Sequence, residues 1–322
     1  MRRTRTLAAC IAAGVSCAAP VRADDVPLPP TAQPEASIVE IYRDEGLFFE
    51  GPVWAPASGK LFFTAFGKDN QQILRLDRPG TATVWLDRTQ GVNGMFLSRD
   101  GKILGAQAYG HRVMQYAVGP DGPVEEEVLA ENPAWNQPND VCQSPSGDIY
   151  FTDPDFKERK NSAVYHLRAK AVAPRGGAFA PRGGAFAARR IISDMPVPNG
   201  VIASNDGRTL YVSDSHLKLW RAYPVRGDGS VGPGRVFFNP DTPDPADPDG
   251  MTIDEQGNLY LTGRGGVWAV SAAGEAIGFI PMPRFCSNVT FGGPQGRTLF
   301  MTCKGAVYSL AMRVRGGDPR YW

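Results

Sequence analysis

The chain consists of short apolar runs separated by turn sequences, and six of these runs open with a polar residue. That residue is usually followed by Gly or Asp, and the starts lie roughly 40 to 60 residues apart. Their positions are Glu50, Asn93, Asn139, Asn199, Asp249 and Ser287-Asn288. Short strands in units of roughly 40–50 residues are typical of a β-propeller. The pattern therefore predicts an all-β fold, a six-bladed β-propeller with four antiparallel strands in each blade.

Within each unit the pattern reads as strand, tight turn, strand. The run 141–143 leads through Ser146-Gly147-Asp148 to a second apolar run at 149–152, and the same form recurs in the other units. Gly beside Asp or Asn supplies the positive φ angles that such hairpin turns need. We expect the run 37–42 to add a strand to the last blade and close the ring, which removes exposed sheet edges.

The direction of the strands assigns the loops to two faces. If every inner strand begins on the face that carries Glu50 and Asp249, its first turn lies on the opposite face and the second strand returns. The loops after the second strands then surround the same opening as the polar strand starts. These loops are 107–111, 153–155, 214–218, 263–266 and the turn at Lys304.

The N-terminus has the features of a secretory signal peptide, predicted over residues 1–23. Three arginines among the first five residues precede an apolar stretch, and small residues before Asp24 suit cleavage. The apolar stretch is too short to span a bilayer as a permanent helix. We therefore expect a periplasmic or secreted protein without stable insertion in a membrane.

The composition of the rest of the chain indicates a linker, one large domain and a short tail. Residues 24–37 are rich in Pro and are expected to be a disordered linker, 38–317 form the propeller, and 318–322 are a C-terminal tail. Within the propeller, Pro-Arg-Gly-Gly-Ala-Phe-Ala occurs twice in succession at 174–187. We expect this low-complexity repeat to be a flexible loop insertion rather than a binding element.

Export would place the cysteines in an oxidising compartment. Cys286 and Cys303 lie equally far from the turn 293–296, on opposite arms of one expected hairpin. We expect them to face each other, either as a disulfide or as two packed thiols, and the sequence leaves both open. Cys142 follows an apolar residue in an inner strand and is expected to be a small buried hydrophobe.

Charge and motifs argue against several functions. The net charge is +1 with both signs interspersed, so nucleic acid is not an expected partner. The three histidines are far apart and form no H-E-x-x-H zinc motif. The chain has no G-x-S-x-G elbow, and no G-x-G-x-x-G that follows a strand and opens a helix. These absences argue against acyl-enzyme chemistry and dinucleotide binding.

The polar strand starts supply oxygen ligands at one end of the expected channel. The residues concerned are Glu50, Asn139, Asn199 and Asp249. Hard cations such as Ca²⁺, Mg²⁺ and Mn²⁺ prefer carboxylate and amide oxygens. The alternative is that Asn and Asp before Gly are ordinary turn formers. Their recurrence at strand starts favours a cation site, because buried carboxylates need a cation or hydrogen-bond donors.

Several short motifs follow one another in a specific order along the chain. They are Phe49-Glu50-Gly51-Pro52-Val53-Trp54, Gln137-Pro138-Asn139-Asp140-Val141, Tyr150-Phe151-Thr152-Asp153-Pro154, Pro198-Asn199-Gly200, Leu210-Tyr211-Val212-Ser213-Asp214, Pro248-Asp249-Gly250 and the run 288–294. In order and spacing they resemble the gluconolactonase/senescence-marker-protein family, which includes regucalcin and bacterial aldonolactonases, over roughly residues 38–317. That family is a six-bladed propeller with a divalent metal in its channel, so the resemblance implies the same here.

The resemblance also implies roles for individual residues. Glu50, Asn199 and Asp249 become direct ligands of one divalent cation, and Asn139 becomes a ligand directly or through water. Ca²⁺ is the first expectation for the cation, with Mg²⁺, Mn²⁺, Zn²⁺ and iron as alternatives. Asn93 and Asn139 would contact the substrate.

The implied reaction is hydrolysis of a lactone, a small-molecule substrate, by water with assistance from the cation. Asp249 is the expected base that takes a proton from the water, and Asp140 is the second candidate. Aldonolactones are the expected substrates. Two alternatives remain, namely hydrolysis of other esters or phosphotriesters at the same site, and a non-catalytic binding propeller in which the metal is structural.

Two positions depart from the family. Gly91 stands where relatives that act on sugar lactones often carry Arg, and the run 107–111 lacks a His-Gly pair common in bacterial members. His111, His216 and Arg264 are the candidates for replacing the missing substrate contacts.

Overall fold

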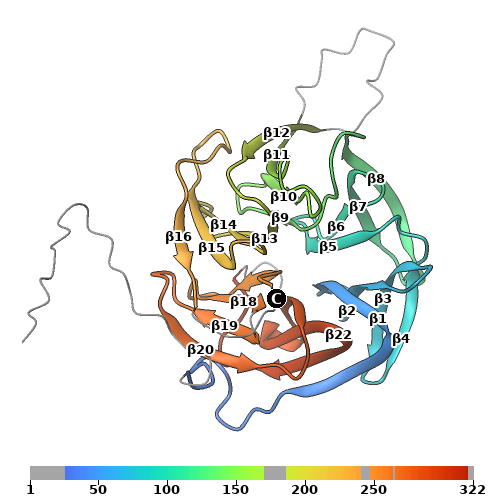
Figure 1. The fold of residues 1–322 in the computed structure, drawn as a ribbon. Coiled ribbons are helices and arrows are strands. Elements are labelled where there is room, and N and C mark those ends of the chain that lie inside the picture. The colour runs from blue at the N-terminus through green and yellow to red at the C-terminus, as the bar shows by residue number, and fades with distance from the viewer. Residues whose placement is uncertain (1–25, 170–185, 241–246, 264, 318–322) are drawn as a thin grey trace, which may run out of the picture.

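The computed structural model describes residues 26–169, 186–240, 247–263 and 265–317 and shows an all-β chain. Its sheets are arranged around a central axis as a β-propeller (Figure 1). The predicted fold class, all-β with a propeller arrangement, is therefore confirmed.

Four of the sheets have four antiparallel strands each, as predicted. The first contains β5 (Val92–Leu97), β6 (Ile103–Gln107), β7 (Arg112–Val118) and β8 (Pro123–Glu131). The second contains β9 (Val141–Gln143), β10 (Ile149–Asp153), β11 (Ala163–Ala169) and β12 (Phe186–Ile192). The third contains β13 (Pro198–Ala203), β14 (Thr209–Asp214), β15 (Leu219–Pro224) and β16 (Arg235–Phe238). The fourth contains β17 (Met251–Ile253), β18 (Leu259–Gly263), β19 (Gly266–Val270) and β20 (Ala276–Pro281).

The remaining strands form a single six-stranded sheet in the order β21-β22-β1-β2-β3-β4. Its members are β21 (Cys286–Gly292), β22 (Thr298–Ala311), β1 (Val39–Ala55), β2 (Lys60–Phe66), β3 (Gln71–Arg78) and β4 (Thr81–Leu86), with a short 3₁₀ turn, η2, at Pro294–Gly296. The prediction of six separate blades is therefore wrong for the described residues, which form five sheets. The reason is the length of β1, whose first part pairs with β22 and whose second part pairs with β2.

Closure of the ring through β1 was predicted and is confirmed. Val39 pairs with Ser309 of β22, while Ala55 at the other end of β1 pairs with Lys60 of β2. Six strands contact one another in a closed ring around the axis, in the order β1, β5, β9, β13, β17 and β21. Each of the six polar strand starts lies on, or directly before, one of these inner strands.

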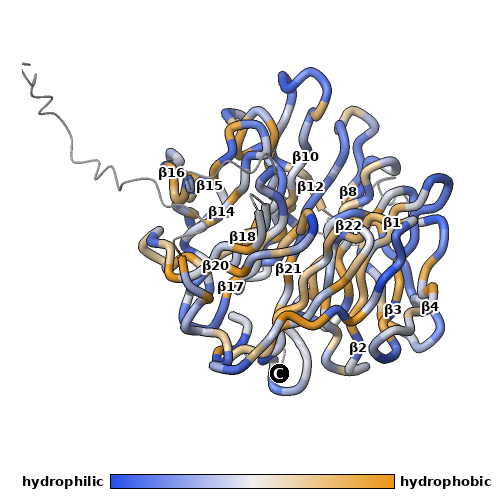
Figure 2. Tube along the Cα trace, turned by 60° about the horizontal axis from the view of Figure 1, so that its bottom comes forward, coloured by the Kyte–Doolittle hydropathy of each residue, from blue (hydrophilic) through white to orange (hydrophobic). Residues whose placement is uncertain are grey.

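Apolar side chains fill the space between neighbouring sheets. Trp220 on β15 and Trp268 on β19 are fully buried, and the ring of Phe238 on β16 lies 5.8 and 5.4 Å from theirs. Figure 2 shows the same division along the chain, with hydrophobic stretches in the strands and hydrophilic residues concentrated in the connecting loops. Burial between sheets therefore holds the ring together.

The segment 26–37 differs from the disordered linker expected there. Pro27 accepts a hydrogen bond from the backbone N–H of Phe279 on β20, and Ala32 forms a β-bridge with Met312. The hydroxyl of Tyr260 donates to Thr31 Oγ1 at 2.7 Å. Although prolines cannot donate a backbone hydrogen bond, their carbonyls still accept one from an edge strand, and this fixes the segment.

Several predictions concern residues outside the described ranges. These are the signal peptide at 1–23, most of the duplicated loop at 174–187, Arg264 and the tail at 318–322. In the described part of the chain, no helix has the length and apolar character that a membrane span requires.

The two cysteines expected to face each other do so. Cys286 on β21 pairs directly with Cys303 on β22, both are buried, and both are free thiols in this structure. Burial, with Cys303 alongside, holds the pKa of the Cys286 thiol well above its usual range. Cys142 on β9 is fully buried, as expected.

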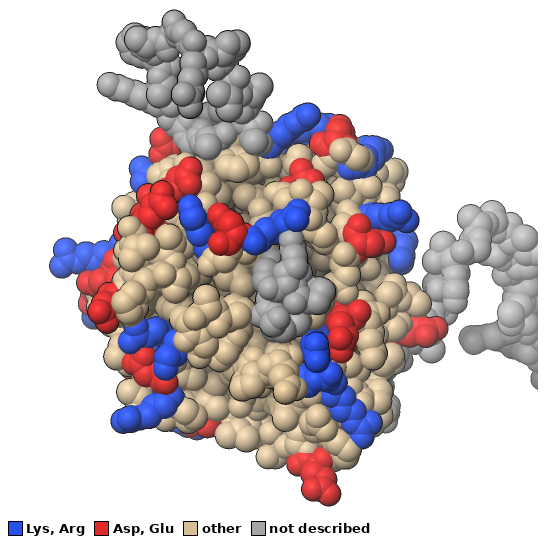
Figure 3. All heavy atoms as spheres, turned by 180° about the vertical axis from the view of Figure 1, so that it is seen from behind, with Lys and Arg blue, Asp and Glu red and all other residues tan. Residues whose placement is uncertain are grey.

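Charged side chains of both signs are interspersed on the molecular surface. The face drawn in Figure 3 carries Lys and Arg side chains next to Asp and Glu, without a large area of one sign. This distribution agrees with the interspersed charges of the sequence.

The closing strand offers a direct test of the ring. Ile41 on β1 is 7% exposed and packs in a cluster with Phe49 and Val307, whereas Val39 two residues earlier is 50% exposed. Ile41→Ala should lower the free energy of unfolding by about 2–5 kcal/mol because it leaves a cavity where the ring closes. Val39→Ala should change it by less than about 0.5 kcal/mol. Urea unfolding of both variants measures the difference, and equal effects would contradict the role of this strand in closure.

Candidate functional site

A cavity of about 390 Å³ opens at the end of the propeller where the inner strands begin. Five of the six polar strand starts line it, namely Glu50, Asn93, Asn139, Asn199 and Asp249. Loops that follow second strands contribute the rim, including Tyr109, Phe156 and His216. The structure therefore brings five of the strand starts together with two of the expected rim loops, 107–111 and 214–218, and with Phe156 just after a third. The described residues of 263–266 and Lys304 do not line this cavity.

A β-bulge interrupts the inner strands at the site residues. The pairing register shifts between Glu50 and Val53 on β1, and between Val92 and Met95 around Asn93 on β5. Similar shifts occur at Asn199 on β13 and just before Asn288 on β21. A bulge turns the backbone locally and changes the direction of a side chain, which is why bulges are common next to active sites. Here the bulges coincide with the side chains that line the cavity.

The glycines after the site residues permit close contact between neighbouring sheets. A β-carbon on Gly51 would lie 2.2 Å from the carbonyl oxygen of Asn93, and one on Gly200 would lie 2.3 Å from that of Asp249. Gly51 also has a φ of 44°, a conformation that other residues adopt only with strain. In each Xaa-Gly pair, therefore, the first residue belongs to the site and the glycine leaves room for the backbone of the neighbouring strand.

Buried hydroxyls link the inner strands to one another at the level of the site. We call them the hydroxyl belt, and they donate to backbone carbonyls on or directly before the next inner strand at 2.6–3.0 Å. The pairs are Thr64 to Asn93, Thr152 to Asn199, Ser213 to Asp249, Thr262 to Ser287 and Ser287 to Phe49. Between β5 and β9 the link is instead the backbone N–H of Gly94, which donates to Asn139 O at 2.7 Å. The belt fixes the site residues relative to one another, because every link ends at or next to one of the polar strand starts.

Glu50 is held from two sides. Its Oε2 accepts a hydrogen bond from Asn288 Nδ2 at 2.9 Å and another from the backbone N–H of Gly51. Glu50 is only 4% exposed, and this burial raises its pKa to about 7, against the opposing effect of the two hydrogen bonds. Asn288, the sixth polar strand start, therefore serves the site by orienting the Glu50 carboxylate.

Asn199 is oriented in a comparable way. Its Nδ2 donates to Ser215 Oγ at 3.0 Å, and Ser215 Oγ donates to the carbonyl of Pro248 at 2.7 Å. The Asn199 side-chain oxygen, Oδ1, is buried and has no hydrogen-bond partner, and the same is true of Asn93 Oδ1. A buried amide oxygen without a partner is costly unless a ligand satisfies it.

The carboxylates of the site raise one another's pKa. The pKa of Asp249 lies well above its usual range because the side chain is buried and because Glu50 and Asp140 carry negative charge nearby. Burial and Glu50 raise the pKa of Asp140 in the same way. The three acidic groups therefore form one electrostatic unit that a cation would stabilise in its ionised form.

Asp140 itself does not line the cavity. Its Oδ1 accepts the backbone N–H of Val141 at 3.0 Å, and its Oδ2 accepts that of Val201 at 3.2 Å. A β-carbon on Gly94 would lie 2.0 Å from Asp140 Oδ1, so the carboxylate packs against the strand before it. These contacts make Asp140 a bridge between inner strands, with no oxygen directed at a substrate.

Of the three rim residues predicted to contact the substrate, the structure places one at the cavity. His216 lines the cavity, together with Arg159 and with Lys218, which forms an ion pair with Asp247. His111 is not among the lining residues, and its Nδ1 is buried without a partner. Arg264 lies outside the described residues.

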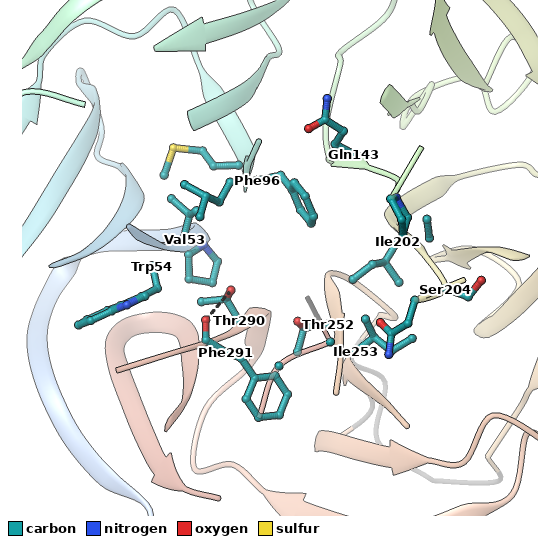
Figure 4. Close-up of a pocket in the computed structure, with 18 residues that line it drawn as sticks. Val53, Trp54, Phe96, Gln143, Ile202, Ser204, Thr252, Ile253, Thr290 and Phe291 are labelled. Atoms are coloured by element: carbon teal, nitrogen blue, oxygen red, sulfur yellow. Dashed lines mark hydrogen bonds between the residues drawn. The ribbon is translucent and has the colours of Figure 1, made fainter. Parts of the chain in front are cut away.

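A second cavity, of about 380 Å³, lies at the other end of the same inner strands. It is lined by residues two or three positions after the site residues, such as Val53, Met95 and Ile202. Phe96 and Ile202 point into its opening in Figure 4, whereas Trp54 points away from it. Each inner strand therefore runs from a polar end to an apolar end.

The hydroxyl belt and the roles of Asn288 and Ser215 were not predicted from the sequence. A signal exists for four members of the belt, since a hydroxyl follows the apolar run of their second strands at Thr64, Thr152, Ser213 and Thr262. Thr302 has the same position but donates to Asn288 O on the adjacent strand of its own sheet. In the remaining second strand Ala106 occupies this position, in the sheet where Gly94 makes the link instead.

The donor set suits a hard divalent cation. Within the described ranges, no three His, Cys, Asp or Glu side chains are grouped so that they could hold a metal ion by themselves. A cation would therefore depend on amide oxygens as well as on Glu50 and Asp249, and Asn199 Oδ1 is free to serve. Oxygen-only sets of this kind are typical for Ca²⁺ and Mg²⁺ and atypical for zinc.

Fold and site together define a β-propeller with an acidic, oxygen-lined cavity at one end of its axis. The chain belongs to the SMP-30/gluconolactonase/LRE-like family, whose model matches residues 48–305.

Individual relatives agree with this assignment. A gluconolactonase from Zymomonas mobilis is 28% identical over 318 residues, covering 86% of this chain and 82% of the relative. A solved gluconolactonase from Xanthomonas campestris is 26% identical with a TM-score of 0.72, covering 92% and 97% of the two chains. The calcium-binding protein regucalcin from Agrobacterium tumefaciens shares the fold, with a TM-score of 0.68 and 22% identity over 87% of this chain and 96% of its own.

Asp153, beside the rim, gives a prediction for pH dependence. Burial raises its pKa to about 6, against hydrogen bonds from Asn136 and Gln137. A carboxyl with a raised pKa binds its proton more tightly when folded, so its contribution to stability falls as pH rises from about 4 to about 6. The free energy of unfolding of the native chain, measured relative to that of Asp153→Asn, should therefore fall by about 2–3 kcal/mol between pH 4 and pH 6.

Urea unfolding at several pH values between 4 and 7 measures this difference. Asp155 is the control, because backbone hydrogen bonds from Glu158 and its neighbours lower its pKa. Its contribution to stability is lost only below about pH 4, so Asp155→Asn should leave the pH dependence between pH 4 and 7 almost unchanged. If Asp153→Asn leaves the slope between pH 4 and 6 unchanged, the burial argument for this carboxylate is wrong.

Proposed function

We propose that this chain is a divalent-metal-dependent lactone hydrolase that opens sugar lactones of the aldonolactone type. The observation that carries the proposal is the buried Asn199 Oδ1, which has no partner and belongs to the same cavity as Glu50 and Asp249. Two carboxylates with raised pKa beside buried amide oxygens without a partner form a site that suits a divalent cation. The names of the relatives, gluconolactonase and pentonolactonase among them, support the lactone as substrate.

Glu50, Asn199 and Asp249 would hold the cation, with Asn139 as a further ligand directly or through water. When bound, the cation supplies Lewis-acid polarisation of the lactone carbonyl and neutralises charge that develops on its oxygen. Ca²⁺ is the first candidate because the ligands are all oxygens, with Mg²⁺ and Mn²⁺ next.

The protein residues supply orientation and proton transfer. Asn93, whose Oδ1 also has no partner, lies in the cavity where it can bind a hydroxyl of the substrate. As water attacks the carbonyl carbon, its proton passes to a carboxylate oxygen of Asp249. The bond from the carbonyl carbon to the ring oxygen then breaks, and the ring oxygen leaves as a hydroxyl after taking a proton back from Asp249. We assign this transfer to Asp249 rather than to Asp140, because Asp249 lines the cavity and Asp140 does not.

Hydrolysis of D-glucono-1,5-lactone tests the proposal. The rate above spontaneous opening should disappear on chelation and return with one divalent cation. Glu50→Gln and Asp249→Asn should each lower kcat/KM by about 10²–10⁴-fold, because one removes a ligand and the other removes the base. Asp206→Asn, at an exposed turn after an inner strand, is the matched control and should retain the native rate.

Two results would count against this function. A rate that survives complete removal of metal would exclude the metal-dependent reaction. No rate with any cation would remove this substrate and favour another ester or a binding role.

Asn288 provides a separate test of the metal site. Asn288→Ala removes the hydrogen bond to Glu50 Oε2 and should weaken Mn²⁺ or Ca²⁺ binding by about 10–100-fold, the usual effect of losing a group that orients a ligand. Isothermal titration calorimetry on the metal-free protein measures the affinity without reference to activity. Asn205→Ala, at the opposite end of the propeller, should bind the cation with native affinity. Equal affinities for the native protein and Asn288→Ala would show that Glu50 does not need this support.

A further inference from the structure

The turn that carries Tyr109 is fixed against the turn at Gln90 and Gly91. The backbone N–H of Ala108 donates to Gly91 O at 2.8 Å, and that of Tyr109 donates to Gln90 O at 3.0 Å. The side chain of Gln107 adds a third link, from Nε2 to the carbonyl of Thr89 at 2.8 Å. The position of Tyr109 at the mouth of the cavity is therefore determined by backbone contacts before any substrate binds.

The ring of Tyr109 occupies the space in which a side chain at position 91 would lie. A β-carbon on Gly91 would be 2.7 Å from Tyr109 Cδ2 and 3.0 Å from Cε2 and Cγ. Gly91 also has a φ of 76°, which other residues adopt only with strain. The glycine and the ring therefore belong together, and the ring forms part of the wall of the cavity.

Large apolar side chains are exposed around this mouth. Tyr109 is 57% exposed and Phe156 is 42% exposed, and both line the cavity. Leu217, 41% exposed, lies between His216 and Lys218, which also line it. Exposed aromatic side chains that gather at the opening of a cavity are typical of a ligand-binding surface.

We propose that Tyr109 and Phe156 form an apolar collar that selects lactones carrying an alkyl or aryl substituent. The inference rests on the proposed lactone hydrolysis and names a further class of lactone, beside the sugar lactones, that the same site takes. The polar floor of the cavity would hold the lactone ring, and the substituent would lie between the two aromatic rings, away from water. Removal of hydrocarbon from water favours binding in proportion to the area covered.

The collar can select a substrate by apolar contact alone, without a hydrogen bond or ion pair from the rim. His216, Arg159 and Lys218 approach the cavity from the loops after β10 and β14, whereas Tyr109 approaches from the loop after β6. A substituent that projects past Tyr109 meets an aromatic surface and does not require a hydrogen bond.

Two lactones with the same six-membered ring provide the test. δ-Nonalactone carries a four-carbon chain, and δ-valerolactone carries none, so the ratio of their kcat/KM values reports on the substituent alone. In the native protein this ratio should exceed about 10, because each methylene held in an apolar pocket raises kcat/KM by about 10-fold or more. In the double variant Tyr109→Ser/Phe156→Ser the ratio should fall at least about tenfold, mainly through a higher KM for δ-nonalactone.

Three further variants make the test specific to the ring. Tyr109→Phe keeps the ring and should keep the native ratio, whereas Gly91→Ala displaces the ring and should lower it. Val124→Ser removes an apolar side chain that is 73% exposed on β8 and should leave the ratio unchanged. Thermal unfolding of each variant shows whether it is folded.

The outcomes separate this inference from the function on which it rests. A native ratio near 1, or a ratio that the double variant does not change, overturns the collar while leaving hydrolysis of D-glucono-1,5-lactone intact. If the metal-loaded protein hydrolyses none of the three lactones, both the collar and the proposed function are wrong. A native ratio above 10 that falls in the double variant and in Gly91→Ala, but not in Val124→Ser, supports the collar.

Discussion

The close approach of six inner strands to one axis is the constraint on which the rest of the structure depends. It requires glycine after the site residues, because a β-carbon at Gly51 or Gly200 would overlap the backbone of the neighbouring strand. It also requires that backbone carbonyls near the axis find donors, and the hydroxyl belt supplies these from the second strands. The same contacts place each polar strand start at a defined distance from the next. The site is thus a consequence of how the ring closes.

This arrangement has an electrostatic consequence. Glu50, Asp140 and Asp249 are buried near one another, so each raises the cost of ionising the others. Hydrogen bonds reduce this cost: Asp140 accepts two backbone N–H groups, and Glu50 accepts hydrogen bonds from Asn288 and Gly51. Hydrogen bonds from Asn199 and from the backbone of Gly250 likewise lower the pKa of Asp249, whereas Asn93 Oδ1 and Asn199 Oδ1 are buried without a partner. A divalent cation in the cavity would stabilise the ionised carboxylates and satisfy an amide oxygen together, which connects the fold to the proposed chemistry.

Much of this could be predicted from the sequence, because it depends on local periodicity. The inner-strand starts, the hairpin turns, the pairing of Cys286 with Cys303 and two of the rim loops all follow from residue spacing. The merging of the first and last blades into one sheet could not be predicted, since it depends on β1 continuing as one strand that pairs with β22 along its first part and with β2 along its second. The support of Glu50 by Asn288 joins residues 238 positions apart and exists only in the closed ring. Asp140 was the second candidate for the base, after Asp249, and its packing against Gly94 away from the cavity could not be predicted from the sequence.

The most direct test of the account is the position of a bound cation in crystals grown with Mn²⁺, located by its anomalous scattering. The account predicts one strong peak in the cavity, in contact with carboxylate oxygens of Glu50 and Asp249 and with Oδ1 of Asn199. Its coordination sphere should retain a position open to substrate. A cavity without a peak, or a peak bound elsewhere while Asn199 Oδ1 remains without a partner, would contradict the account.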